Sequence, residues 1–157
     1  IMYLTAADIM TRDPITVTAE TNLAQIATLL SSKRISAVPV CNSDHTMAGI
    51  VGEADVLRPF IESARVRSDW WLGMIAEGED LSRDFLDYLR RHLRTAADVM
   101  VRHVITAGED ATLPQLAELM TKHAIKSLPI LRDGRVVGIV SRSDLVEAIA
   151  RAPAMLV

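Results

Sequence analysis

The sequence contains few of the residues that build cross-linked or disordered proteins. Its 157 residues include one cysteine, Cys41, so no disulfide bond can form within the chain. Such cysteine usage is typical of a reducing compartment, and we expect a cytoplasmic protein in which Cys41 is a small buried hydrophobe. Glycine and proline are scarce, at 7 and 6 residues, which argues against extended disorder.

Long apolar runs are also missing, and we expect no export signal. No apolar stretch approaches the roughly 20 residues that a membrane-spanning helix needs, and residues 1–4 do not resemble a secretory signal. The net charge of -3 and the pI of about 5.8 provide no basic surface for nucleic acid. We therefore expect neither a membrane nor a nucleic acid among the partners.

The chain lacks the residue patterns of common active sites. Its histidines do not have the spacing of metal ligands; they are His45, His92, His103 and His123. A glycine-rich phosphate loop is absent, and no serine or cysteine has a recognisable base partner. These absences argue against catalysis, so we expect no enzyme, no metal site and no required cofactor.

What the sequence does contain is an internal repeat. Residues 5–10, Thr-Ala-Ala-Asp-Ile-Met, return ninety residues later as Thr-Ala-Ala-Asp-Val-Met at 95–100. The segment Ile-Ser-Ala-Val-Pro-Val at 35–40 is matched by Ile-Lys-Ser-Leu-Pro-Ile at 125–130. The chain is therefore a duplication of one unit. A unit of roughly 55 residues buries little surface by itself, so we expect the two copies to pack together.

Each copy predicts the element order α-β-α-β-β-α. Thr5 or Thr95 can cap a first short helix, and apolar residues at helical spacing predict a second helix at 23–30 and 113–120. Short apolar runs predict the strands, at 15–17, 36–41 and 47–51 in the first copy and at 104–106, 127–131 and 135–140 in the second. The dipeptide Asp133-Gly134 predicts a tight hairpin, and a last helix is expected to begin near Glu53 or Arg142.

The expected fold class is α/β, of the α+β kind, with two repeats packed sheet to sheet around a shared core. We place repeat one at 1–62, a helical insert at 63–94, repeat two at 95–152 and a tail at 153–157. The insert contains Trp70-Trp71 and a helical stripe of Leu81, Phe85, Tyr88, Leu89 and His92. It is interpreted as a helical hairpin that covers the repeats or as a dimer or partner surface, since tryptophans are good interface anchors; the two interpretations are compatible.

These residues carry a resemblance to a known family. The Asp-[Ile/Val]-Met starts, the segments around Pro39 and Pro129, and the closing Gly49…Asp55 and Gly138…Asp144 resemble those of cystathionine β-synthase (CBS) domains. The tandem is similar to a CBS pair, or Bateman module, of bacterial signalling proteins. The resemblance implies a pseudo-twofold axis, two equivalent clefts between the repeats, and association of two pairs into a homodimer. It also implies an adenosine-type ligand: AMP, ADP, ATP, S-adenosylmethionine or NAD.

The resemblance places the main site in the second copy. The family's ribose motif, Gly-h-h-[Ser/Thr]-x-x-Asp with h apolar, is complete at residues 138–144. Asp144 is expected to accept from the ribose hydroxyls, while Ser141 and the helix start meet phosphate and Arg142 adds a cation. Ser141 and Asp144 can instead serve only as a capping box, with the Asp residues of both copies at exposed helix starts.

The base of the ligand is expected to rest against the first copy. A flat base needs apolar walls and backbone groups that can contact its edge, and Pro39 is expected to leave nearby strand carbonyls without a partner. Carried over from the family, the base-binding residues are Met10, Ile15, Ile35, Ser36, Ala37 and Pro39.

The second cleft is expected to be weaker, because the first copy departs from the motif. Gly52 stands where the motif has a hydroxyl, and Glu53 stands where the second copy has Arg142, although Asp55 is retained. An anion in place of a cation near phosphate costs roughly 1–4 kcal/mol at a separation of about 4 Å. The residues expected at this cleft are Asp55, Met100, Ile105, Ile125, Lys126 and Ser127, with Lys126 partly offsetting Glu53.

The sequence therefore predicts a regulatory module that senses a ligand and transmits its binding to an effector protein that the sequence does not identify. The alternative is a non-catalytic dimerisation or interaction scaffold with degenerate clefts. A homodimer is expected, because the helix faces after each motif Asp are more apolar than a small repeat needs for itself. These faces consist of Val56, Leu57, Phe60 and Ile61 and of Leu145, Val146 and Ile149.

Overall fold

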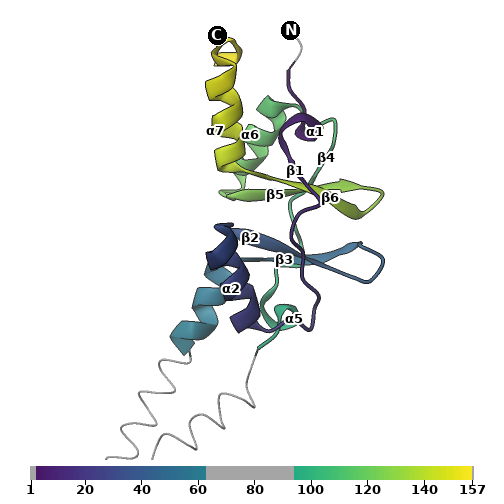
Figure 1. The fold of residues 1–157 in the computed structure, drawn as a ribbon, viewed down its shortest axis with the longest axis vertical. Coiled ribbons are helices and arrows are strands. Elements are labelled where there is room, and N and C mark those ends of the chain that lie inside the picture. The colour runs from purple at the N-terminus through teal and green to yellow at the C-terminus, as the bar shows by residue number, and fades with distance from the viewer. Residues whose placement is uncertain (1–2, 63–93, 157) are drawn as a thin grey trace, which may run out of the picture.

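A computed structural model describes residues 3–62 and 94–156 of the chain. The described residues form two halves, each a small sheet with its longer helices on the outer side, and the two sheets face each other (Figure 1). This arrangement confirms the expected fold class of tandem α+β repeats. The predicted insert lies outside the described residues, Arg94 excepted, and with it Trp70-Trp71 and the stripe at 81–92.

Each half contains an antiparallel hairpin and two longer helices. The first half consists of α2 (Leu23–Lys33), β2 (Ala37–Cys41), β3 (Met47–Gly52) and a helix at residues 53–62. The second half consists of α6 (Leu113–Lys122), β5 (Ser127–Arg132), β6 (Arg135–Ser141), α7 (Arg142–Arg151) and the short 3-10 helix η1 (Pro153–Leu156). Helix α7 follows β6 without a loop, so the end of the sheet and the start of the helix form one corner.

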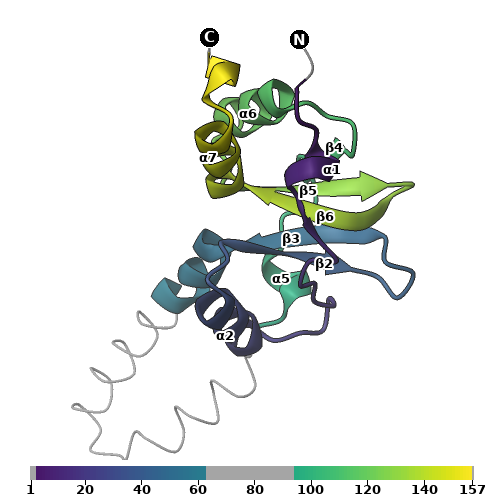
Figure 2. The same cartoon turned by 45° about the horizontal axis from the view of Figure 1, so that its top comes forward.

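The halves exchange their first segments. Helix α1 (Ala6–Ile9) and strand β1 (Thr11–Arg12) precede the first half in the chain but pack on the second, where β1 pairs with β6. Conversely, α5 (Ala96–Val99) packs on the first half, and Val101 just after it bridges to Ile50 of β3. Figure 2 shows α1 beside β6 and α5 beside β3. The chain therefore crosses between the halves at the start of both repeats.

The hydrophobic core divides along the same lines. One cluster joins α1 and the residue after it to the second half and includes Ala6, Met10, Leu116, Leu128 and Val140. The other joins α5 to the first half and includes Ile26, Val38, Val51, Ala96 and Val99. The expected shared core is therefore two cores, and each contains side chains from both repeats. Burial of this kind is the main stabilising term for so small a unit.

A glycine at each crossing gives the exchanged segment room. A Cβ at Gly138 of β6 would lie 2.2 Å from the Met10 sulfur, and a Cβ at Gly49 of β3 would lie 2.7 Å from the Val101 carbonyl oxygen. Both distances are shorter than any van der Waals contact. The glycine that opens the Gly-h-h-[Ser/Thr]-x-x-Asp motif is therefore needed for packing.

Capping residues, apolar spacing and turn residues in the sequence explain α2 and the second hairpin. Asn22 accepts from the Gln25 backbone N–H at 2.9 Å, and the Gln25 side chain accepts from the Asn22 N–H at 3.1 Å, which is a capping box at the start of α2. Ile26 and Leu30 are buried on the predicted face of that helix. The turn residues Asp133-Gly134 have φ of 52° and 77°, so the predicted hairpin is confirmed.

The predicted strands at 15–17 and 104–106 are wrong. In the first copy, Val17 forms an isolated parallel bridge to Val40; in the second, the strand is β4 (Ala107–Gly108), which pairs with β5. The apolar residues just before these points, Ile15 and Ile105, pack against the two cores without strand partners.

The carbonyl expected to be free beside Pro39 is also occupied. The Val17 N–H donates to the Pro39 carbonyl oxygen at 3.0 Å, and the Cys41 N–H donates to the Val17 carbonyl oxygen at 2.8 Å. Val17 thus closes the outer edge of β2. Cys41 is buried, as expected. Burial raises the pKa of its thiol, and a hydrogen bond from the Thr16 side chain partly offsets this rise.

Candidate functional site

Two pockets lie between the facing sheets. The first pocket, of about 490 Å³, reaches the start of α7, and the second pocket, of about 340 Å³, reaches the start of the helix at 53–62. Both volumes lie in the range of small-molecule sites. The pockets share four lining residues, Ser36, Ala37, Lys126 and Ser127. The hydroxyl groups of Ser36 and Ser127 are hydrogen-bonded across the halves, 2.7 Å apart.

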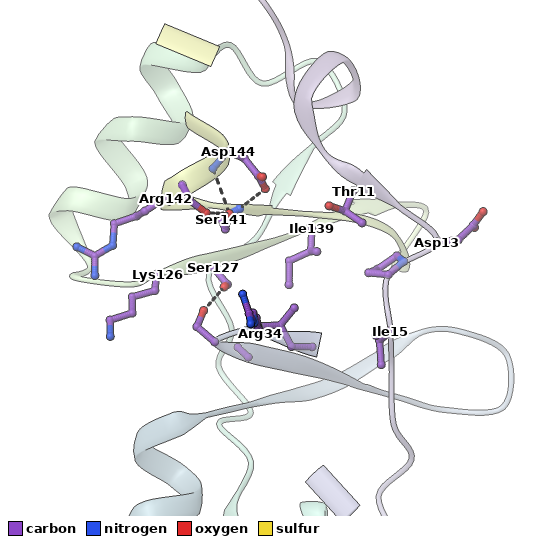
Figure 3. Close-up of a pocket in the computed structure, with 15 residues that line it drawn as sticks. Thr11, Asp13, Ile15, Arg34, Lys126, Ser127, Ile139, Ser141, Arg142 and Asp144 are labelled. Carbon is purple, nitrogen blue, oxygen red and sulfur yellow. Dashed lines mark hydrogen bonds between the residues drawn. The ribbon is translucent and has the colours of Figure 1, made fainter. Parts of the chain in front are cut away.

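The corner between β6 and α7 forms one wall of the first pocket. Asp144 Oδ2 accepts from the Ser141 backbone N–H at 2.8 Å, and Ser141 Oγ accepts from the Asp144 N–H at 3.1 Å (Figure 3). The capping box predicted as an alternative is therefore present. Within the part of the chain that the structure describes, Asp144 Oδ1 accepts no hydrogen bond. The cap thus fixes the carboxylate by one oxygen and leaves the other as an acceptor.

Three cationic side chains line the first pocket. Arg142 begins α7, Lys126 precedes β5, and Arg34 follows α2. In Figure 3, Arg142 and Lys126 lie at one end of the pocket, and Asp13 lies at the other. The positive end of the α7 dipole adds to this charge. The first pocket can therefore hold an anionic group near Arg142.

Arg34 and several of its neighbours in the first pocket were not predicted from the sequence. Arg34 ends α2 in the left-handed conformation, with φ of 52°. Its position directly after a Lys at the end of a capped helix was the available signal, because helices commonly end in this conformation. The other lining residues that the sequence did not predict are Thr11, Asp13, Pro14, Ile139 and Ser143.

Most of the residues predicted for the main site meet at the first pocket. They are Ile15, Ile35, Ser36, Ala37, Ser141, Arg142 and Asp144. Met10 and Pro39 do not line it. Met10 is 9% exposed and packs in the core of the second half, and Pro39 is fully buried within β2.

The second pocket has a different chemistry at the equivalent corner. Asp55 Oδ2 accepts from the Gly52 N–H at 2.8 Å, and its Oδ1 is 3.4 Å from an Arg58 guanidinium nitrogen. Asp55 is only 8% exposed, so the expectation of an exposed helix start is wrong for the first copy. No hydroxyl side chain takes part in this cap, because Gly52 stands at the position of Ser141.

Most residues predicted for the weaker cleft line the second pocket. They are Asp55, Ile105, Ile125, Lys126 and Ser127. Met100 does not, since it packs against Gly49 and the core of the first half. Lys126 Nζ lies 3.8 Å from Glu53 Oε1, as predicted. Both side chains are more than half exposed, so this ion pair adds little to stability.

Over residues 3–62 and 94–156, no group of three or more His, Cys, Asp or Glu side chains is arranged to hold a metal ion. In the same ranges, no helix has the length and apolar character needed to cross a membrane.

Comparisons with known proteins bear on the whole chain. The family model described as CBS domain matches residues 6–62 and 96–151. An uncharacterized protein of Methanocaldococcus jannaschii is 35% identical over 150 residues, covering 90% of this chain and 89% of the relative. Inosine-5′-monophosphate dehydrogenase of Thermoplasma acidophilum is 27% identical over 139 residues, and the match spans 22% of that enzyme.

Solved structures of CBS pairs share the fold. A CBS domain pair in complex with 5′-methylthioadenosine and S-adenosyl-L-methionine superposes with a TM-score of 0.70 at 23% identity, covering 96% of this chain and 98% of the other. The structure of CBSX2 in complex with AMP superposes with a TM-score of 0.71 at 21% identity, and the match covers 96% of this chain and 98% of the other. A putative acetoin utilization protein from Vibrio cholerae superposes with a TM-score of 0.73 at 22% identity, and the match covers 99% of this chain and 98% of the other.

Proposed function

This chain belongs to the CBS domain family, and from that premise we propose that it is a regulatory module that binds an adenosine-type ligand in the first pocket. The observation that carries the proposal is the corner at Ser141–Asp144: these four residues line one cavity of about 490 Å³, and among the described residues no group donates a hydrogen bond to Asp144 Oδ1. The two proposed CBS repeats span residues 1–62 and 95–152.

The chemistry of the pocket fits the parts of a nucleotide. Asp144 Oδ1 is available to accept from a ribose hydroxyl, and charge-assisted hydrogen bonds of this kind are strong. Arg142 and the start of α7 suit a phosphate. Ile15 and Ile35 supply apolar surface for the base, on the opposite half of the molecule from Asp144.

Regulation follows from where the ligand would lie. A ligand in the first pocket contacts both halves, so its binding stabilises one relative arrangement of the sheets. A partner protein that prefers this arrangement then binds more tightly when the ligand is present. We propose that the chain acts in the cytoplasm on such an effector and performs no catalysis itself.

Relatives support the ligand class and the regulatory role. Related CBS pairs have been solved with 5′-methylthioadenosine and S-adenosyl-L-methionine, and with AMP. In the dehydrogenase of Thermoplasma acidophilum, the matching region is about a fifth of the enzyme. A module that forms only part of an enzyme in this way is suited to control it.

The test is a titration of the wild-type chain and two variants with AMP. Asp144→Ala removes the acceptor, and hydrogen bonds to charged groups contribute about 1.5–3 kcal/mol, so affinity should fall about tenfold or more. Asp55→Ala is the matched control at the equivalent corner and should change the tight site much less. Equal losses, or no binding of AMP, 5′-methylthioadenosine or S-adenosylmethionine by the wild type, would contradict the proposal.

The alternative function is a scaffold with empty clefts, and exposed apolar side chains favour an assembly role beside ligand binding. Leu57, Phe60 and Ile61 are 56%, 68% and 53% exposed, and Val146 of α7 is 66% exposed. Leu145, which was also expected on this surface, is buried in the core. We propose that these faces meet in a homodimer. Light scattering should give twice the chain mass, and Phe60→Glu should reduce it to the monomer.

A further inference from the structure

We propose that the two pockets select ligands by charge: the first takes a nucleotide with phosphate, and the second takes an adenosine-type ligand without phosphate, either neutral or cationic. The proposal rests on the proposed function, because it requires adenosine-type ligands to enter the pockets. It assigns the second pocket a ligand class of its own rather than a weaker copy of the first.

The charge difference that favours phosphate in the first pocket arises at two pairs of equivalent positions; a third pair, Asp13 and His103, has the opposite sense, and Asp13 lies at the end of the first pocket away from Arg142 (Figure 3). Arg142 begins the helix at the first pocket, and Glu53 begins the helix at the second. Arg34 and Ala124 form the second pair: both follow a helix and both have positive φ, 52° and 51°. Equivalent backbone positions therefore present two cations to the first pocket and an anion and a methyl group to the second.

Lys126 does not restore the missing charge. It lines both pockets, and its ammonium lies 3.8 Å from the Glu53 carboxylate. A phosphate in the second pocket would compete with Glu53 for this lysine and would face a carboxylate at close range. A phosphate in the first pocket has Arg34 and Arg142 as further partners.

The rest of the second pocket suits a nucleoside. Asp55 stands at the motif position that Asp144 holds in the first pocket, so a carboxylate is retained there, although its Oδ1 is shared with Arg58 at 3.4 Å. Apolar side chains make up much of the remaining wall, namely Ile50, Val101, Val104, Ile105 and Ile125. Glu53 then faces the 5′ end of the ligand, where a neutral or cationic substituent is favoured over phosphate.

The experiment is a calorimetric titration of the full chain with two probes, AMP and 5′-methylthioadenosine, which differ in phosphate. We expect one tight AMP site per chain in the wild type. Glu53→Arg should tighten AMP binding at the second pocket by about tenfold or more, so that a second AMP site becomes measurable. Arg142→Glu should weaken AMP by a similar factor and leave the affinity for 5′-methylthioadenosine within about threefold.

Glu20→Arg is the matched control, because Glu20 is exposed and lines neither pocket; it should bind both probes like the wild type. Glu53 is itself more than half exposed, so its variants should fold, and Glu53→Gln should shift AMP binding in the same direction by less. Two equal AMP sites in the wild type, or no change in AMP binding on Glu53→Arg, would overturn the charge selection and leave the proposed function intact. Failure of the wild type to bind either probe would instead refute the proposed function.

Discussion

At the scale of single residues, Asp144 serves both the fold and the proposed site. Its Oδ2 caps α7 through the Ser141 N–H at 2.8 Å, and the residue lines the first pocket. The sequence posed capping and ligand contact as alternatives, since both need the same Ser-x-x-Asp spacing. The structure shows that capping holds the carboxylate in place, so the two roles are compatible.

Gly49 provides a residue-scale prediction about the crossing segments. Gly49→Ala should destabilise the protein by about 1–3 kcal/mol, because the new Cβ would lie 2.7 Å from the Val101 carbonyl oxygen, a backbone atom that cannot rotate away. Chemical denaturation measures the change. Gly108→Ala is the control, since a Cβ there meets nothing within 4 Å and should be nearly neutral. Equal free energies of unfolding for the two variants would show that the Val101 segment does not pack closely against Gly49.

Some residues at the pockets could not be predicted from the sequence. Ile15, Ile35 and the residues at the start of α7 lie where the motif and its family resemblance suggested. Met10 and Pro39 follow the same pattern but are buried, because an apolar residue beside a pocket and one in the core have the same sequence signal. Arg34 carries no motif; it lines the first pocket from the left-handed position at the end of α2.

At the scale of elements, periodicity predicted the longer helices and the hairpins, and it failed for the shortest strands. Helices α2 and α6 have buried faces and caps that can be recognised in the sequence. Strands of two residues, such as β1 and β4, are too short for an alternating pattern. Each of these strands pairs with a strand of the half on which its segment packs, and tertiary packing decides which half that is.

The short exchanged helices give an element-scale prediction about pH. The Thr95 N–H and hydroxyl donate to Asp98 at 2.8 and 3.2 Å, and these hydrogen bonds lower the pKa of Asp98 below its usual 3.8. A lowered folded-state pKa means that the stabilisation is complete above the unfolded value and is lost as the pH falls below about 3.8. Asp98→Asn keeps an acceptor but does not titrate.

Urea unfolding of wild type and Asp98→Asn at pH 5 and pH 3 measures this contribution. The wild type should lose more stability between the two pH values than the variant does. The same comparison for Asp8→Asn tests the equivalent helix α1, where Thr5 hydrogen bonds lower the pKa of Asp8. Identical acid dependence in wild type and variants would show that these caps do not contribute to folding.

At the scale of the whole molecule, the exchange of first segments links the stability of the two halves. Met10 belongs to the first repeat in sequence, yet it packs in the core of the second half. Met10→Ala should cost about 2–5 kcal/mol. Hydrogen exchange should become faster in β5 and β6 with less effect on β2 and β3. Val99→Ala, on the other exchanged helix, should show the reverse pattern. If each variant instead speeds amide hydrogen exchange mainly in the repeat to which the mutated residue belongs in sequence, the crossing of the first segments would be contradicted.

The proposed ligand lies in the first pocket and contacts both halves at once. The most direct measurement is the change in backbone amide NMR shifts as AMP is added to the wild-type chain. Binding in the first pocket should give the largest changes in two places far apart in the sequence, Ser141–Asp144 and Ile35–Ala37, with smaller changes at Gly52–Asp55. Changes confined to one half, changes largest at Gly52–Asp55, or no changes at saturating AMP would contradict it.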